Sequence, residues 1–303
     1  MQILYSYYKS EGNTLEIASK ELKHSIDKSY EQYLLFLQIP LEVTHYARNV
    51  IEKKKNKRLP SPEDLNPNCR FIDNQFVAQL NDNAMLAKRL KDIPVSWAQN
   101  EDFIPKFYKM ITESDIYKEY MDAEEGSFEA DKTIWARIFK LLIYRSEELG
   151  ELLEDMSIYW NDDAELVLGM VQKTIKSFEL EKGESQLIMP LYKDREDADF
   201  AAKLLNNAIR EEDDYRGRIE KKTQHWEADR IAFIDKLLMQ IALAEVVTFS
   251  SIPVKVSINE YLDIAKSYST TKSSVFINGV LDSVIKDLKK EGLFTKVGRG
   301  LME

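Results

Sequence analysis

The sequence predicts an all-α protein, and three observations lead to this fold class. Residue usage favours helices, since only 10 Gly and 8 Pro occur among 303 residues and straight-chain residues, which lose little rotamer freedom in a helix, are abundant. Apolar residues recur at the three- and four-residue spacing of a helix with one buried face. No segment shows the sustained alternation of apolar and polar residues typical of strands. We therefore expect roughly ten to twelve helices.

The N-terminal half predicts a series of helices. Residues 1–10 carry apolar side chains at helical spacing, and a longer pattern runs from residue 14 to 39. Pro40 should kink or end that helix, because proline lacks an N–H and clashes with the preceding turn. A further helix to about residue 55 ends in the basic run 53–58, followed by a proline-marked loop. The remaining helical patterns of this half cover about 68–92, 101–121, 128–146 and 161–180.

The C-terminal part has the clearest pattern. After a linker at 181–194, helices are dense from 195 to about 291. Residues 228–248 are apolar on most faces, which indicates a central buried helix. Ser257 followed three residues later by Glu260 matches a capping box that would start the next helix. Gly279 lies inside the last helix at a cost of about 1 kcal/mol relative to Ala, so a close approach by another helix or by a ligand should offset it.

Composition limits the classes of function. The hydrophobic share of 44% fits an ordinary globular chain, and the single cysteine, Cys69, excludes an internal disulfide and fits a reducing compartment. The sequence shows no secretory signal and no apolar span, so we expect a cytoplasmic protein without membrane contact. The net charge of −10 gives no support to nucleic-acid binding. His24, His45 and His225 lack metal-ligand spacing, and no nucleotide or nucleophile motif occurs, so we expect no metal, no cofactor and no catalysis.

A long C-terminal motif points to a family. Residues 252–291 read IPVKVSINEYLDIAKSYSTTKSSVFINGVLDSVIKDLKKE. They contain a proline, an Asn-Glu helix that ends in Ala-Lys-Ser-Tyr, a small polar loop, and then Phe-Ile-Asn-Gly-Val-Leu-Asp. This pattern resembles the C-terminal signature of the bacterial transcription antitermination factor NusB family, and the start MQILYSYY resembles the family's first helix. The resemblance implies a NusB-like helical bundle.

The resemblance also divides the chain. It covers about 1–22 and 195–291, so we expect residues 1–22 to form the first helix of the NusB-like core and 195–303 its C-terminal part. Residues 23–194 would be an additional helical insert. Family members usually carry an arginine-rich stretch before the first helix, and this sequence begins after that point. Either the sequence is truncated there or the cationic contribution comes from elsewhere, such as the basic run 53–58, which is otherwise a solvated loop.

The family's binding sites suggest candidate residues for RNA. Gln2 and Tyr5 correspond to family positions in the first helix, where a tyrosine can stack on an unpaired base. Lys272, Phe276 and Asn278 lie at the start of the last helix, where Ser273 is a plausible cap and unpaired N–H groups favour a phosphate. The alternative is that Tyr5, Phe276 and Asn278 only pack helices together. The same two interpretations apply to Tyr7 and Tyr8.

The resemblance further implies a protein partner. Trp226, Asp229 and Asp235 lie before or in the first turns of the central helix, where the family's surface for the ribosomal protein NusE includes acidic positions; their alternative roles are core packing and interaction with the helix dipole. The implied function is binding of boxA-type single-stranded RNA with NusE in the RNA polymerase antitermination complex of ribosomal RNA operons. The alternative is a protein–protein scaffold of the same fold with weakened or lost RNA binding.

Overall fold

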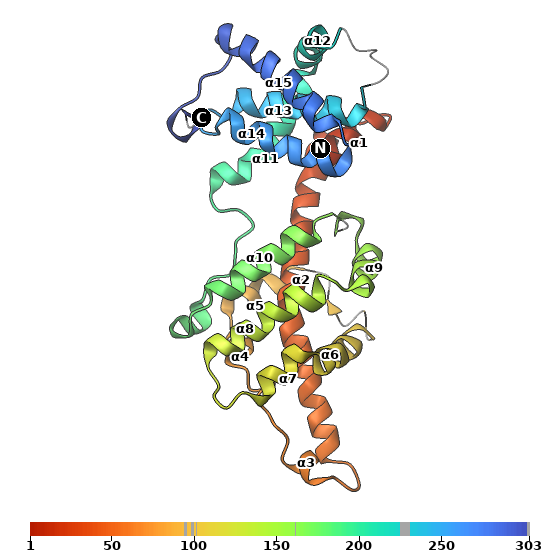
Figure 1. The fold of residues 1–303 in the computed structure, drawn as a ribbon, viewed down its shortest axis with the longest axis vertical. Coiled ribbons are helices and arrows are strands. Elements are labelled where there is room, and N and C mark those ends of the chain that lie inside the picture. Colours follow the sequence, from red (N-terminus) through yellow and green to blue (C-terminus); the bar gives the residue numbers. More distant parts are fainter. Residues whose placement is uncertain (94–95, 98–99, 101, 161, 225–230, 302–303) are drawn as a thin grey trace. The chain divides into compact units, whose positions relative to one another are not determined.

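The protein is helical throughout the residues that the computed structural model describes, which are 1–93, 96–97, 100, 102–160, 162–224 and 231–301 (Figure 1). These residues contain fifteen α-helices and no strand, which confirms the all-α prediction. They divide into two compact units. Unit 1 comprises residues 1–24 and 192–303, and unit 2 comprises residues 25–191. No helix in the described part of the chain is long and apolar enough to cross a membrane.

Unit 1 is built around helix α13 (Phe233–Thr248), in which every residue from Leu237 to Val246 is buried. The apolar pattern correctly predicted this central helix, because a helix without a polar face is stable only when neighbours cover it on all sides. The helices that contact α13 are α1 (Gln2–Lys9), α11 (Arg195–Arg210), α12 (Glu212–Lys222), α14 (Val254–Tyr268) and α15 (Ser273–Lys290).

The two ends of the chain share one core. Leu4 of α1 is buried in the same cluster as Leu281 and Leu288 of α15. Gln240 of α13 secures this arrangement, because its Nε2 donates to Tyr8 Oη at 2.8 Å and to the Ala208 carbonyl at 2.7 Å. Each of these contacts joins residues more than thirty positions apart, so only the closed bundle can form them.

The capping box predicted at Ser257 and Glu260 is wrong. Helix α14 already begins at Val254, after Pro253 as N-cap. Proline fits this boundary because its fixed φ suits the start of a helix and its missing N–H leaves no donor unpaired. Ser257 is fully buried one turn inside the helix, and its hydroxyl has no hydrogen-bond partner among the described residues.

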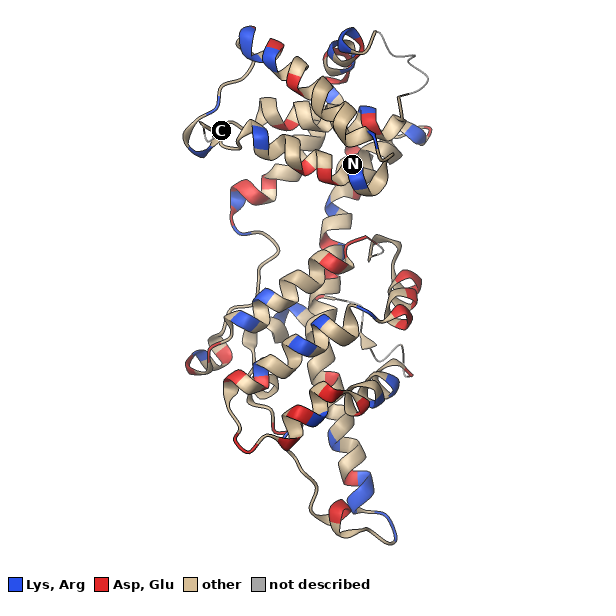
Figure 2. Cartoon of the chain, in the orientation of Figure 1, with Lys and Arg blue, Asp and Glu red and all other residues tan. Residues whose placement is uncertain are grey.

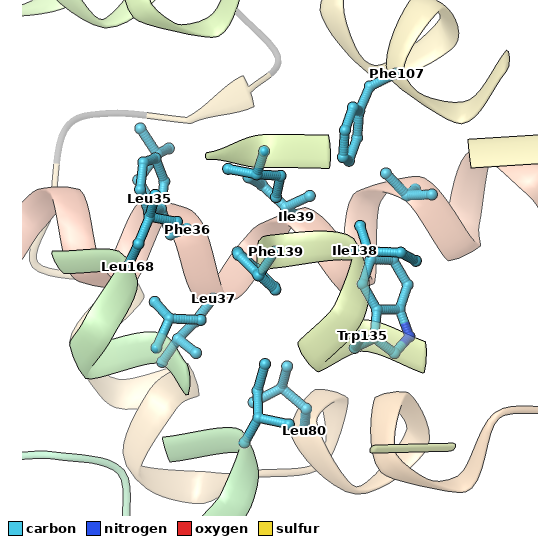
Figure 3. Packing of buried hydrophobic residues seen from close by; sticks show 14 of the residues in the cluster. Leu35, Phe36, Leu37, Ile39, Leu80, Phe107, Trp135, Ile138, Phe139 and Leu168 are labelled. Carbon is cyan, nitrogen blue, oxygen red and sulfur yellow. The ribbon is translucent and has the colours of Figure 1, made fainter. Parts of the chain in front are cut away.

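Unit 2 surrounds the single helix α2 (Leu15–Lys55), whose first part belongs to unit 1. Pro40 is expected to kink or end this helix, and an end at Pro40 is wrong, since α2 continues through it as an α-helix. Interior proline costs a helix about 3 kcal/mol. Here the residues before it, Leu34, Leu35, Phe36, Leu37 and Ile39, are all at most 1% exposed, and Figure 3 shows four of them converging with residues of other helices. Burial of several such side chains, each worth about 1.5–3 kcal/mol, offsets the proline.

Most of the other helices of unit 2 are shorter than the sequence pattern suggested. In chain order these helices are α3 (Pro62–Leu65), α4 (Gln75–Asn81), α5 (Ala84–Leu90), α6 (Phe103–Glu113), α7 (Asp115–Asp122), α8 (Phe128–Ile138), α9 (Glu147–Met156) and α10 (Ala164–Ser177). Helix α3 lies in the expected loop, and α9 was not predicted. The predicted helices 68–92 and 101–121 are each split by a capping side chain. Asn83 Oδ1 accepts from Leu86 N at 2.8 Å, and Ser114 Oγ accepts from Tyr117 N at 3.2 Å. Such local bonds start a new helix within a continuing apolar pattern.

Truncation of a buried side chain in the central helix α13 should destabilise unit 1. Leu238 is fully buried, so Leu238→Ala leaves a cavity, and we expect a loss of about 2–5 kcal/mol in the free energy of unfolding. The measurement is urea denaturation followed by circular dichroism at the helical minimum. Val256→Ala on α14, where the side chain is 46% exposed, serves as the control and should change stability little. Equal effects of the two substitutions would contradict the central position of α13.

Candidate nucleic-acid and partner interface

Helix α1 presents Gln2 and Tyr5 at the surface of unit 1. Tyr5 is 42% exposed, and its ring meets Phe233 of α13 edge to face at a centroid distance of 5.5 Å. The ammonium of Lys9 lies 4.4 Å from the centre of the same Phe233 ring. An exposed aromatic ring with a cation on the next turn is an arrangement that can stack a base and neutralise a phosphate.

Tyr7 and Tyr8 lie on the packed side of α1. Both are partly buried against the core of unit 1, and their rings meet edge to face at 5.1 Å. Burial raises the pKa of Tyr8 well above its usual range, although the hydrogen bond from Gln240 acts in the opposite direction. The geometry of these two residues therefore fits the helix-packing interpretation.

Asp235 holds the loop between α14 and α15. Asp235 is only 4% exposed, and its carboxylate accepts hydrogen bonds from Ser269 Oγ at 2.5 Å and from Ser273 Oγ at 2.8 Å. Hydrogen bonds to a charged group are worth about 1.5–3 kcal/mol each. The carboxylate lies below the surface, so its evident role is to position the loop that carries Lys272.

The start of α15 differs from the prediction. Ser273 is the first helical residue, the N-cap is Lys272, and no side chain caps the helix. The Ser273 hydroxyl is engaged by Asp235 instead. Because a carboxylate already lies at this helix terminus, it satisfies part of the positive dipole that a phosphate would use. An anion would therefore depend more on the exposed Lys272 side chain than on the terminus itself.

Lys272 and Phe276 line a hollow of about 570 Å³ beside α15, which we call the α12–α15 hollow. Gly279 lies further along the same side of α15, and Lys222 reaches the hollow from α12. Lys222 Nζ forms an ion pair of 2.5 Å with Asp287, and the hydrogen bond lowers the pKa of that carboxyl. The hollow thus combines a partly buried aromatic ring with one exposed and one paired lysine.

Asn278 lies on another side of α15. It lines a second hollow, of about 790 Å³, together with Lys255 of α14 and Lys289 of α15. Residues two positions apart on a helix point about 200° apart, so Phe276 and Asn278 face different hollows. A ligand that contacts both residues must therefore cross the crest of α15.

Two of the predicted partner residues, Trp226 and Asp229, lie outside the residues that the structure describes.

The basic run 53–58 lies at the end of α2, where Lys57 pairs with Asp64 and Lys55 with Glu52 at 3.8 Å. It belongs to unit 2 and not to unit 1.

Sequence reasoning missed several cations of this surface. Lys9 lies four residues after Tyr5, a spacing that places both on one side of a helix, so the pattern held a usable signal. Lys222 and Lys255 had no such signal, because their positions beside α15 result from the packing of separate helices.

Comparison with known proteins identifies the family. The NusB family model matches residues 166–286. The chain is 37% identical over 138 residues to the transcription antitermination protein NusB of Salinibacter ruber, which covers 44% of this chain and 86% of that protein. This chain belongs to the NusB family.

Other NusB proteins match over shorter stretches. The chain is 47% identical over 105 residues to that of Chloroherpeton thalassium, or 35% of this chain and 50% of that protein. It is 43% identical over 72 residues to that of Natranaerobius thermophilus, or 24% of this chain and 52% of that protein. The chain thus spans about half the length of these two NusB relatives. No solved structure matches it.

The match to the NusB model begins at residue 166, within α10, and so before the predicted start of the C-terminal core at residue 195. Residues 252–286, which contain the Phe-Ile-Asn-Gly helix, lie inside the matched range.

Removal of the Asp235 carboxylate should loosen the loop before α15. Asp235→Ala removes the carboxylate that accepts from both serine hydroxyls and leaves them only their contacts with each other and with Thr270, so we expect a loss of about 1–3 kcal/mol in stability. Amide hydrogen exchange should become faster at residues 269–274. Asp263→Ala, which removes a 70% exposed carboxylate from α14, is the control and should change neither quantity. Unchanged exchange in Asp235→Ala would show that the hydrogen bonds do not hold the loop.

Proposed function

We propose that this NusB-family chain acts in transcription antitermination as a non-catalytic factor. In this proposal it binds boxA-type single-stranded RNA together with the NusE ribosomal protein, in the RNA polymerase antitermination complex that transcribes ribosomal RNA operons. Membership of the NusB family supports the antitermination role, since the relatives it matches are named transcription antitermination proteins. The boxA-type RNA, the NusE partner and the ribosomal RNA operons are proposed in addition to the role that these names state.

The observation that carries the RNA site is the position of Gly279 in the α12–α15 hollow beside Lys272 and Phe276, where no side chain covers the backbone. A Cβ at this position would meet no atom within 4 Å, so no neighbouring helix accounts for the glycine. The cost of interior glycine remains, about 1 kcal/mol relative to Ala. Of the two explanations considered for Gly279, no helix among the described residues approaches it closely, and close approach of a ligand is the one that we propose.

The position of Gly279 gives the RNA a path. Phe276 and Lys272 lie on one side of α15, and Asn278 lies on another. We propose that the RNA backbone crosses α15 at Gly279, where no side chain obstructs it. One base would stack on Phe276, Lys272 would contact a phosphate, and the amide of Asn278 would hydrogen-bond to a base edge.

Helix α1 would extend this surface. Phe233 and Asp235 lie in the first turn of α13, and they contact Tyr5 of α1 and Ser273 of α15, respectively. The two predicted RNA-binding segments therefore pack at the same end of α13. In the proposal Tyr5 stacks on a further base, Gln2 donates a hydrogen bond, and Lys9 supplies a cation.

NusE would bind near the same end of α13. Trp226 and Asp229 remain the proposed contacts, while Asp235 would act indirectly by holding the α14–α15 loop. We further propose that unit 1 is the NusB-type body and that unit 2 is the helical insert.

The alternative function is a protein–protein scaffold that has weakened or lost RNA binding. The net charge of −10 and the carboxylate of Asp235 beside the start of α15 favour it. The alternative predicts an affinity for boxA RNA that equals the affinity for a scrambled sequence and falls steeply with salt.

Substitutions in the α12–α15 hollow test the RNA site. Lys272→Ala should lose a phosphate contact, and Phe276→Leu should lose base stacking while keeping an apolar side chain. We expect Phe276→Leu to weaken binding by about 1–3 kcal/mol. The measurement is fluorescence anisotropy of labelled boxA RNA with NusE present, at two salt concentrations. Lys266→Ala, which removes a cation of α14 paired with Asp263, is the matched control. If both hollow variants bind as the unaltered chain does, the site is refuted.

Gly279→Ala should raise the stability of the protein and at the same time weaken RNA binding. The added Cβ meets nothing within 4 Å, so the helix should gain up to about 1 kcal/mol. The same methyl group would obstruct a backbone crossing α15, so RNA affinity should fall. Gly217→Ala on α12 is the control, because its Cβ also has open space and its helix should gain similarly. Higher stability with unchanged RNA affinity in Gly279→Ala would contradict the crossing path.

A further inference from the structure

Unit 2 contains a groove between α8 and α10 that the proposed function does not use. Two adjoining hollows form it, of about 440 and 350 Å³, and both are lined by Lys140, Gln172 and Lys176. We call it the α8–α10 groove. Figure 2 shows Lys and Arg residues along these two helices, whereas the neighbouring helix α9 is acidic. This concentration of cations stands out in a chain of net charge −10.

The cations of the α8–α10 groove fall into two groups. Lys132 and Arg137 have structural partners, since they pair with Glu129 at 2.7 Å and with Glu119 at 2.6 Å. Lys140, Arg145 and Lys176 are exposed and form no ion pair within the described part of the chain. A set of like charges in one groove repels itself unless an anion is bound. This arrangement therefore favours a polyanionic ligand.

A wide helical turn shapes the groove. Residues Phe139–Ile143 form a π-helix, in which Tyr144 N donates to the Phe139 carbonyl at 3.1 Å. Gln172 of α10 stabilises this junction, because its Nε2 donates to the Ala136 carbonyl at 2.6 Å. Single π-turns carry a backbone cost and occur frequently at functional sites. Here the turn leads directly to Tyr144 and Arg145, which both line the groove.

Tyr144 adds a feature that a simple charged surface lacks. Tyr144 is 55% exposed beside the three cations, although an aromatic side chain gains free energy when buried. Cations that contact phosphates and an aromatic ring that stacks on bases together form the usual platform for single-stranded nucleic acid. Two carboxylates also line the groove, Glu165 and Glu129, and Glu129 is already paired with Lys132.

We propose that the α8–α10 groove binds single-stranded RNA through its phosphate backbone, with one base stacked on Tyr144. This site lies in unit 2 and is additional to the one proposed on unit 1. It provides cationic contacts for RNA on a chain that is acidic as a whole, and it requires no particular base sequence.

The test measures how the full chain binds a labelled single-stranded RNA of random sequence that lacks a boxA element. The variant Lys140→Ala/Arg145→Ala/Lys176→Ala should weaken binding at least about 10-fold at low salt and reduce the slope of log K against log salt by about 2, since each single-strand phosphate contact contributes about 0.7. The matched control is Lys88→Ala/Arg89→Ala/Lys91→Ala. It removes the same charge from exposed residues of the same unit. Equal losses in the two triple variants, or no loss in the first, would overturn the proposal.

Tyr144 provides a second test. Tyr144→Ala should weaken binding by about 5-fold or more through lost stacking, whereas Tyr144→Phe should bind as the unaltered chain does. No effect of Tyr144→Ala on binding would contradict the proposal. The proposal also fails if polyglutamate displaces the RNA as well as unlabelled RNA does at equal charge, because the groove would then be a general surface for anionic polymers or acidic proteins. Measuring the triple variant also in a Lys272→Ala/Phe276→Leu background keeps this result independent of the unit 1 site.

Discussion

The burial of α13 is the constraint on which the structure of unit 1 depends. A helix with no polar face must be covered on all sides, so α1, α11, α12, α14 and α15 are drawn around it. Its first turn then contacts both ends of the chain, through Phe233 to Tyr5 and through Asp235 to Ser273. Residues separated by most of the sequence thus come to one end of the bundle, which is what a composite binding surface requires.

Buried polar groups below this surface determine how its loop residues are positioned. Asp235 is an acidic residue near the start of a helix, which from sequence suggested a partner contact. In the fold it is buried and holds Ser269 and Ser273, so it fixes the loop that carries Lys272. A buried carboxylate that accepts two hydrogen bonds is far less costly than one without them, because burying an unpaired carboxylate costs more than the roughly 2–7 kcal/mol of an unpaired neutral polar group. The loop and α13 therefore form one cooperative element.

Unit 2 shows how packing overrides local preference. Pro40 does not end α2, because the residues before it are enclosed by other helices and gain more from burial than the proline costs. The π-turn at Phe139–Ile143 persists next to the hydrogen bond from Gln172 to Ala136. Both features carry a local cost that tertiary contacts offset. At the π-turn the result is a groove with exposed cations and an exposed ring.

By itself the sequence determined the helical fold class, the central buried helix and the family, because hydrophobic periodicity and a long contiguous motif are local properties of the chain. It did not determine where helices begin, as Ser257 and Ser273 show, since a serine can cap a helix or hydrogen-bond within the core. Only the tertiary structure decided that Phe276 and Asn278 face different hollows, that no described helix approaches Gly279, and that Lys222 lies near Lys272. These facts depend on the angles at which separate helices pack, and such angles follow from the interlocking of many distant side chains and not from any single segment.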